Sequence, residues 1–296
     1  MNTPNGSLSK RSSGYLAFAL ALCFFSPAIV RAQLTSNVLT RVLLIRTPKG
    51  RGTGFTIDVD GRQYLVTAKH LVSGLKKQDE VEVSKDENWN QVHVIIYRCD
   101  DPIDIAVLIP DKQLTLNFPL EPGIAGAMFG QDVYFAGFPH GESYMKGGAL
   151  NLSHPFPFTK RATFSAQAPA TDHPSAGAVI YLDGMNNFGF SGAPIVFRDL
   201  HKNEFVYKVA GVVSGFQPEL LAVMSPQSVK PNEDLSNVEP WRIVKRADGT
   251  KVRYKDTEQR VASNMGIVIG YEIASAIELI KNHPDGPKTT DAPPQP

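Results

Sequence analysis

The chain has 296 residues, 42% of them hydrophobic, with 30 basic and 29 acidic residues. That length and apolar content suit a globular core in one large domain or two smaller halves. The balanced charge provides no basic surface of the kind that nucleic acid requires, so we expect no nucleic-acid partner.

The first 32 residues are expected to form a cleavable secretory signal peptide. Lys10 and Arg11 precede an apolar run of 11 residues at 15–25, and Val30-Arg31-Ala32 places short residues at the −3 and −1 positions of a cleavage site. As a helix this run would reach about 16 Å, against about 30 Å of bilayer hydrocarbon, which argues against an uncleaved anchor. We therefore expect cleavage between Ala32 and Gln33, a secreted or periplasmic product, and no stable membrane insertion afterwards.

Loss of this segment would change the formal net charge from +1 to −2, because it carries three basic residues and no acidic ones. It would also leave Cys99 as the single cysteine. An exported protein with one cysteine has no internal disulfide, so burial and hydrogen bonding must hold the fold. A reactive thiol is the alternative, but we interpret Cys99 as a buried structural residue.

Short runs rich in β-branched residues, separated by Gly, Asp, Asn and Pro, dominate the rest of the chain. Residues 54–59 and 64–67 flank Asp60-Gly61 and predict a hairpin. Further strands are expected at 42–46, 92–97, 105–109, 132–136, 162–166, 178–182, 194–197, 205–214 and 266–269. Strands at this density predict an all-β fold, either a sandwich or a pair of barrels.

The stretch 217–264 interrupts this rhythm of short strands. Within it, residues 241–254 predict a hairpin around Asp248-Gly249, with a basic face. The basic residues of that face are Arg242, Lys245, Arg246, Lys251, Arg253 and Lys255. A solvated hairpin and a substrate-gating flap or partner-binding surface both remain open, since long insertions in compact domains are often functional.

One helix is expected near the end of the chain. Apolar residues recur on one face over 274–280, and Pro284 and Gly286 would stop the helix. Residues 284–296 are polar and rich in proline, and we expect them to form a disordered tail.

Three motifs carry the residue types of a hydrolytic site, in the order His, Asp, Ser. His70 ends the run Leu-Val-Thr-Ala-Lys-His, Asp104 begins Asp-Ile-Ala-Val-Leu, and Ser191 lies within Gly-Phe-Ser-Gly-Ala-Pro. A serine hydroxyl needs a base within hydrogen-bond reach, and an imidazole, with an ordinary pKa of about 6.5, can take its proton. An aspartate can fix the imidazole tautomer, and Asp100 and Asp101 compete with Asp104 for that role.

With these motifs the sequence resembles the trypsin-like serine peptidases, in particular the disulfide-free bacterial branch close to the Deg/HtrA-type protease domain. The α/β-hydrolases and the subtilisin-type enzymes present the same residue types in other orders. The resemblance spans about residues 38–283, including the lesser motifs at 137–141 and 211–215. It implies a chymotrypsin-like double β-barrel with a C-terminal helix and no following PDZ domain. A peptidase domain is expected at 33–283, with a first barrel at about 38–115 and a second at about 125–270.

The resemblance also implies the catalytic roles. His70 would be the general base, Asp104 its orienting partner and Ser191 the nucleophile, while the backbone N–H groups of Gly189 and Ser191 would form an oxyanion hole. No metal or other cofactor is expected. The predicted activity is that of an exported serine endopeptidase acting on a peptide or protein, with its oligomeric state unassigned. The alternative is a catalytically inactive chymotrypsin-fold module that binds or scaffolds.

The substrate-binding residues follow by the same resemblance. Ser214 and Gly215 would supply a strand edge for an extended substrate. Met185, six residues before the nucleophile, would line the base of the pocket for the side chain preceding the cut. Methionine cannot pair with Lys or Arg, so we expect a small or medium apolar side chain there, unless Asp183 takes the position. Phe190 replaces the aspartate that receives a newly cut N-terminus in digestive enzymes, so that activation route is not expected.

Overall fold

The structure, a computed structural model, describes residues 34–85, 88–118, 120–141, 155–170, 177–201 and 204–290. The chain divides into two units, Met1–Thr35 and Ser36–Pro296. The expected signal peptide lies outside the described residues, and the second unit contains all the elements discussed below. No helix within the described ranges combines the length and apolar character needed to cross a membrane.

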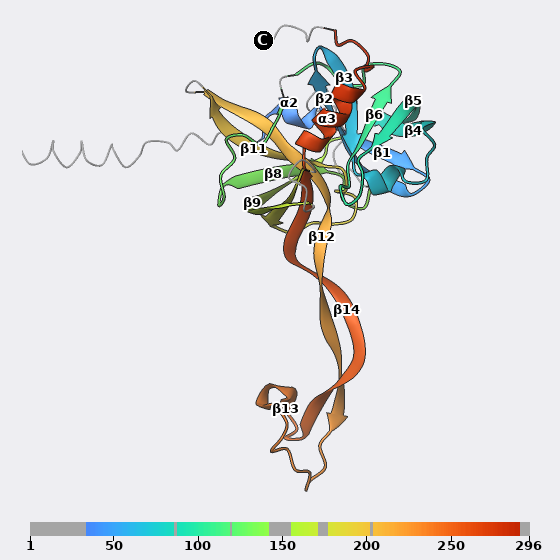
Figure 1. Cartoon of the computed structure of the whole chain (residues 1–296). Coiled ribbons are helices and arrows are strands. Elements are labelled where there is room, and N and C mark those ends of the chain that lie inside the picture. The colour runs from blue at the N-terminus through green and yellow to red at the C-terminus, as the bar shows by residue number, and fades with distance from the viewer. Residues whose placement is uncertain are drawn as a thin grey trace, which may run out of the picture. The chain divides into compact units, whose positions relative to one another are not determined.

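The first part of the second unit is a closed barrel with the strand order β1-β2-β3-β6-β5-β4 (Figure 1). Its strands are β1 (Val42–Thr47), β2 (Gly50–Val59), β3 (Arg62–Thr67), β4 (Gln78–Lys85), β5 (Asn88–Arg98) and β6 (Ala106–Pro110). The hairpin predicted around Asp60-Gly61 is confirmed, and both turn residues have positive φ, 50° and 71°. Strand β4 was not expected, because only its central Val81 and Val83 carry the apolar pattern of the barrel core.

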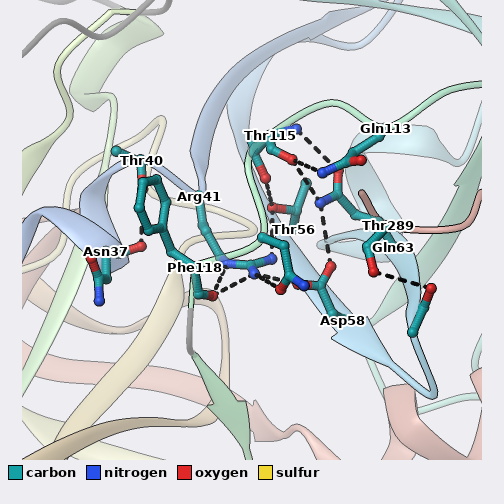
Figure 2. Close-up of polar contacts among 12 residues, drawn as sticks. Asn37, Thr40, Arg41, Thr56, Asp58, Gln63, Gln113, Thr115, Phe118 and Thr289 are labelled. Carbon is teal, nitrogen blue, oxygen red and sulfur yellow. Dashed lines mark hydrogen bonds and ion pairs between the residues drawn. The ribbon is translucent and has the colours of Figure 1, made fainter. Parts of the chain in front are cut away.

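A buried arginine fastens the segment after the first barrel to the barrel wall (Figure 2). Arg41 follows the short helix α2 (Ser36–Leu39), is 1% exposed and forms an ion pair with Asp58. Its Nε donates to the Phe118 carbonyl at 2.8 Å. Nearby, the Gln63 side-chain oxygen accepts the backbone N–H of Thr115 at 3.0 Å. These bonds satisfy a buried charge and fix the path from β6 toward the second barrel.

The second barrel also closes. Strands β8 (Asp132–Gly137), β9 (Phe158–Pro169), β10 (Ala178–Asp183), β11 (Pro194–His201), β12 (Glu204–Ser228) and β14 (Lys251–Glu272) form a ring, because β14 pairs with both β10 and β12. The two-residue strand β7 (Glu121–Pro122) pairs with β12 outside the ring. Side chains such as Phe135, Phe164 and Phe190 fill the core of the second barrel. The predicted chymotrypsin-like double β-barrel is therefore confirmed.

Strands β12 and β14 continue beyond the barrel as a two-stranded ribbon, with β13 (Ile243–Lys245) at its far end (Figure 1). Their pairing runs on from Pro218↔Asn264 to Ser228↔Val252. The stretch 217–264 does depart from the short strands of the barrels, but residues 217–228 and 251–264 extend two barrel strands, which was not expected. The hairpin predicted around Asp248-Gly249 is confirmed by the β13–β14 pairing.

The predicted C-terminal helix is α3 (Ala274–Asn282), which buries Ala276 and Ile280. Residues after it differ from the expected disordered tail. The backbone N–H of Gln63 donates to the Pro287 carbonyl at 3.0 Å, and that of Thr289 donates to the Gly61 carbonyl at 2.9 Å. The chain therefore pairs with the start of β3 through the bridge Arg62↔Lys288, and the Thr290 N–H donates to Gln113 Oε1 at 2.9 Å. Residues 291–296 lie outside the described ranges.

Candidate active site

The end of β3 places His70 against Asp104. A 3-10 turn, η1 (Lys69–Val72), follows the strand and brings the His70 ring to the barrel rim, where its side chain is 48% exposed. The distance from His70 Nδ1 to Asp104 Oδ2 is 2.7 Å, and the His70 backbone N–H donates to Asp104 Oδ1 at 2.8 Å. Both carboxylate oxygens thus contact the same residue, which fixes the orientation of the ring relative to the backbone.

Asp104 lies just before β6, between the buried residues Ile103 and Ile105. The competing Asp101 faces solvent instead, with a side chain 95% exposed that pairs with Lys69 at 2.7 Å. Burial would raise the pKa of the Asp104 carboxyl, but the hydrogen bonds from His70 and Ser214 outweigh it and hold that pKa below its ordinary value. Asp104 is therefore the aspartate that the fold directs to His70, and it stays ionised.

Ser214 connects Asp104 to the serine turn. Its hydroxyl donates to Asp104 Oδ2 at 2.6 Å, and its backbone carbonyl accepts the Ser191 hydroxyl at 3.1 Å. Sequence reasoning assigned Ser214 only to the substrate edge and missed its bond to the carboxylate. The fold brings His70, Asp104 and Ser191 into one site, with the Ser191 hydroxyl bonded to the Ser214 carbonyl.

Two glycines shape the turn that carries Ser191. Gly189 has a φ of 101°, and a Cβ there would lie 2.1 Å from the Phe138 carbonyl oxygen. Gly192 has a φ of 85°, and a Cβ there would lie 2.0 Å from the Thr53 carbonyl oxygen. Only glycine fits both the conformation and the space. Between them Phe190 is fully buried and packs edge-on against Phe135, at 5.1 Å between ring centroids.

Thr53, on β2 of the first barrel, holds this turn from outside. Its hydroxyl donates to the Gly189 carbonyl at 2.7 Å and accepts the Phe138 N–H at 3.1 Å. Its own N–H donates to the Ser191 carbonyl at 3.0 Å. Sequence reasoning missed Thr53, although the flanking Gly52 and Gly54 signal close packing around it.

The backbone N–H groups of Gly189 and Ser191 have no hydrogen-bond partner within the described parts of the chain. The Phe188 carbonyl accepts the His140 N–H at 2.6 Å, and in a trans peptide the next N–H points the opposite way. The Gly189 N–H is thereby turned away from His140. Two free N–H groups on one turn can stabilise a developing oxyanion.

Met185 and Gly215 lie beside this turn. Met185 is 56% exposed, and its carbonyl accepts Lys160 Nζ at 2.9 Å. The Gly215 carbonyl accepts Asn186 Nδ2 at 3.0 Å. Lys160 was not expected here, and its ammonium group, whose pKa burial lowers, adds positive charge next to Met185.

The described residues contain no group of three or more His, Cys, Asp or Glu side chains that could hold a metal ion. Cys99 is half-buried, and burial raises the pKa of its thiol to about 12. A thiol of that pKa is not a nucleophile at neutral pH.

The sequence profile of the trypsin-like peptidase domain family matches residues 52–206. No curated protein matches the sequence. Among solved structures, the Rv3671c protease from M. tuberculosis is similar, at 17% identity over 88% of this chain and 85% of that chain, with a TM-score of 0.47. The HtrA-type protease AlgW is similar at 16% identity over 83% of this chain and 61% of that chain, with a TM-score of 0.48. The MamO protease domain from Magnetospirillum magneticum is similar at 13% identity over 83% of this chain and 98% of that chain, with a TM-score of 0.43.

Proposed function

Since the family profile matches slightly more than half of its residues, the chain belongs to the trypsin-like peptidase family, and on this premise we propose that it is a serine endopeptidase. One observation carries the proposal. The Asp104 carboxylate accepts hydrogen bonds from His70 and from Ser214, whose carbonyl contacts the Ser191 hydroxyl. This chain of contacts supports Ser191 as nucleophile, His70 as base and Asp104 as the orienting carboxylate.

In the proposed reaction the Ser191 hydroxyl first changes its hydrogen-bond acceptor, from the Ser214 carbonyl to Nε2 of His70. His70 takes the hydroxyl proton as Oγ attacks the scissile carbonyl carbon, and Asp104 stabilises the resulting imidazolium. The N–H groups of Gly189 and Ser191 bind the oxyanion. His70 then protonates the leaving amine, which departs and leaves Ser191 acylated. Water attacks the acyl-enzyme carbonyl carbon as His70 takes one of its protons, and His70 returns that proton to Ser191 Oγ as the acid product leaves.

We propose a small or medium apolar side chain immediately before the cut. Met185 offers no charge to pair with Lys or Arg, and the Lys160 ammonium group at its carbonyl opposes them. Peptides that differ only at this position, with Leu, Ala, Lys or Asp, test the preference. Faster cleavage after Lys than after Leu would contradict it.

We also propose that residues 1–32 direct export and are removed before Gln33. N-terminal sequencing of the protein recovered from the periplasm and the medium should give a chain that starts at Gln33. A chain that starts at Met1 and stays in the cell would contradict this.

The activity is tested with an unfolded protein as substrate. Reduced, carboxymethylated α-lactalbumin should be cut at discrete peptide bonds by the wild-type chain, and not by Ser191→Ala or His70→Ala variants of equal stability. Cleavage that survives in Ser191→Ala would overturn the assignment of the nucleophile. A well-folded wild-type chain that cuts neither this protein nor a peptide library would favour the inactive binding module.

A further inference from the structure

Beyond the barrel, one edge of strand β12 has no neighbouring strand in the part of the chain that the structure describes. The pairing of β11 with β12 begins at Pro194↔Val212, so within the described residues β11 covers β12 only up to that point. Val213 still exchanges backbone hydrogen bonds with Gly192 and Ala193, and from Gly215 outward β14 is the one strand that pairs with β12 among the described residues. An isolated two-stranded ribbon is marginally stable in water, and a free strand edge is a template for a further strand.

The two edges of this ribbon differ in charge. From 217 to 228, β12 carries Glu219 as its single charged residue. Between 251 and 260, β14 carries six charged residues, namely Lys251, Arg253, Lys255, Asp256, Glu258 and Arg260. Charged side chains protect strand edges from added strands, so this edge of β14 is protected, whereas residues 219–222 of β12 carry one charge and no proline and form an open edge.

Apolar side chains on the middle of the ribbon are exposed to solvent. Leu220 is 65% exposed, Leu221 is 43% exposed, and Val261, which pairs with Leu221, is 55% exposed. Leu220 and Leu221 are consecutive in a strand, so they present apolar surface on both faces. A strand added to β12 would cover part of each face.

The open edge is continuous with the candidate active site. Gly192 N–H donates to the Val213 carbonyl at 2.7 Å, and the Ser191 hydroxyl donates to the Ser214 carbonyl. Strand β12 therefore runs from the serine turn to Ser228, about 45 Å at roughly 3.3 Å per residue. Figure 1 shows β12 and β14 leaving the barrel together along this path.

We propose that the open edge of β12 beyond the Ser214–Gly215 substrate edge, from Glu219 to Ser228, binds the part of the substrate that lies further before the cleaved bond, as an added antiparallel strand. The proposal rests on the serine peptidase function above. An antiparallel strand whose later residues reach Ser191 has its earlier residues along the ribbon. The expected substrate is an unfolded polypeptide with apolar residues up to about ten positions before the cut.

The prolines and bulges of β12 limit which of its residues can form backbone hydrogen bonds with an added substrate strand. Register shifts interrupt β12 between Val213 and Gly215, between Phe216 and Pro218, and between Ala222 and Met224, and Pro218 and Pro226 have no N–H to donate. Backbone pairing with an added strand is therefore concentrated at residues 219–222. This stretch contains Leu220 and Leu221, so it supplies both backbone bonds and apolar contacts.

Kinetics on peptides of graded length test the proposal. One bond that the enzyme cuts in carboxymethylated α-lactalbumin is chosen, and peptides are synthesised around it. They have 3, 6 or 12 residues before the cut and the same sequence after it. In the wild-type chain KM should fall about tenfold or more from the shortest to the longest peptide, the equivalent of one or more good contacts. In the double variant Leu220→Lys/Leu221→Lys, KM should no longer fall with peptide length, and the shortest peptide should be cleaved as by the wild type. Val244→Lys, an exposed change in β13, is the matched control and should retain the gain.

Hydrogen exchange on the Ser191→Ala chain gives a second readout that needs no activity. The 12-residue peptide should slow exchange of backbone amides at 215–222 and leave those at 246–250 unchanged. Equal KM values for all lengths in a chain that cleaves peptides would overturn the ribbon proposal and leave the peptidase function standing. A dimer in sedimentation that the double variant dissociates, without change in the length dependence, would assign the ribbon to a second copy. Lack of all cleavage would refute the function, and absence of protection would separately refute the ribbon site.

Discussion

At the scale of single residues, the serine turn depends on a hydroxyl from the other barrel. Thr53 is fully buried and satisfies the Gly189 carbonyl and the Phe138 N–H with one side chain. The peptide groups that it holds are next to the two N–H groups assigned to the oxyanion. Thr53 is thus a positioning residue, since it touches the turn and not the reacting atoms.

We predict that Thr53→Val lowers kcat about tenfold, less than the roughly 10²–10³ that removal of a whole oxyanion donor costs. KM should change little, and the free energy of unfolding should fall by about 1–3 kcal/mol because two buried groups lose their partner. Steady-state kinetics and urea unfolding measure both effects. Thr53→Ser keeps the hydroxyl and should restore kcat; a valine variant with unchanged kcat would contradict the role.

The charge on Asp104 gives a second prediction. Burial would raise its pKa, but the bonds from His70 and Ser214 hold the pKa below the ordinary value. Its stabilising contribution is therefore complete above the unfolded-state pKa of about 3.9 and is lost as the pH falls through the lower folded-state pKa.

Asp104→Asn should accordingly lower kcat on the order of 10⁴-fold at neutral pH, because the imidazole loses its orienting charge. Wild type should be the more stable chain at pH 7, and the difference should shrink steadily below about pH 4. Urea unfolding at a series of pH values measures this. A difference that grows on acidification would have the wrong sign.

Sequence motifs led to His70 and Asp104, which lie 2.7 Å apart, and to Ser191, whose hydroxyl contacts Ser214. Each of these residues follows or precedes a recognisable apolar strand. The bonds made by Thr53 and by the Ser214 hydroxyl could not be predicted, because they join residues 136 and 110 positions apart. No local pattern encodes a contact across two barrels.

At the scale of elements, the strands with a clear apolar pattern could be predicted from the sequence. The mostly polar strand β4 and the extensions of β12 and β14 beyond the barrel could not. Strand β4 alternates two valines with acidic and polar residues, so its pattern is too weak to recognise. Strands β12 and β14 were predicted only within the barrel, at 205–214 and 266–269. Apart from Val252, residues 217–228 and 251–264 contain no buried side chain, and a buried face is what produces a periodic apolar pattern in the sequence.

The Arg41 network supplies the prediction for this scale. Arg41→Ala leaves Asp58 partly buried without its partner, so the free energy of unfolding should fall by about 3–5 kcal/mol. Arg161→Ala breaks an exposed pair with Asp132 at 3.7 Å and should change it by less than about 1 kcal/mol. Equal effects of the two changes in urea unfolding would contradict the structural role of the network.

At the scale of the whole molecule, the two barrels meet at the serine turn. The Thr53 N–H donates to the Ser191 carbonyl, and Gly192 packs against Thr53 with no space for a side chain. The family resemblance carried by the three motifs implied the double barrel, whereas strand density alone left a sandwich or a pair of barrels open. The attachment of residues 286–289 to the start of β3 and the turn before it was not predicted, because a polar, proline-rich segment carries no strand pattern.

We predict that Gly192→Ala destabilises the chain and abolishes activity by forcing the barrels apart. Gly249→Ala is a matched control, since Gly249 has the same φ of 85° with nothing within 4 Å of a Cβ. The control measures the conformational cost alone, about 1–2 kcal/mol. Thermal unfolding should show a clearly larger loss at Gly192, and equal losses would mean that contact between the barrels is unimportant there.

The measurement that tests the central claim most directly is covalent labelling of Ser191. A fluorophosphonate reacts with a serine only when a neighbouring base activates its hydroxyl. The account predicts one adduct per chain on the peptide containing Ser191, identified by mass spectrometry, with labelling lost in Ser191→Ala and strongly slowed in His70→Ala and Asp104→Asn. A folded wild-type chain that stays unlabelled, or one labelled equally well without Ser191, would contradict it.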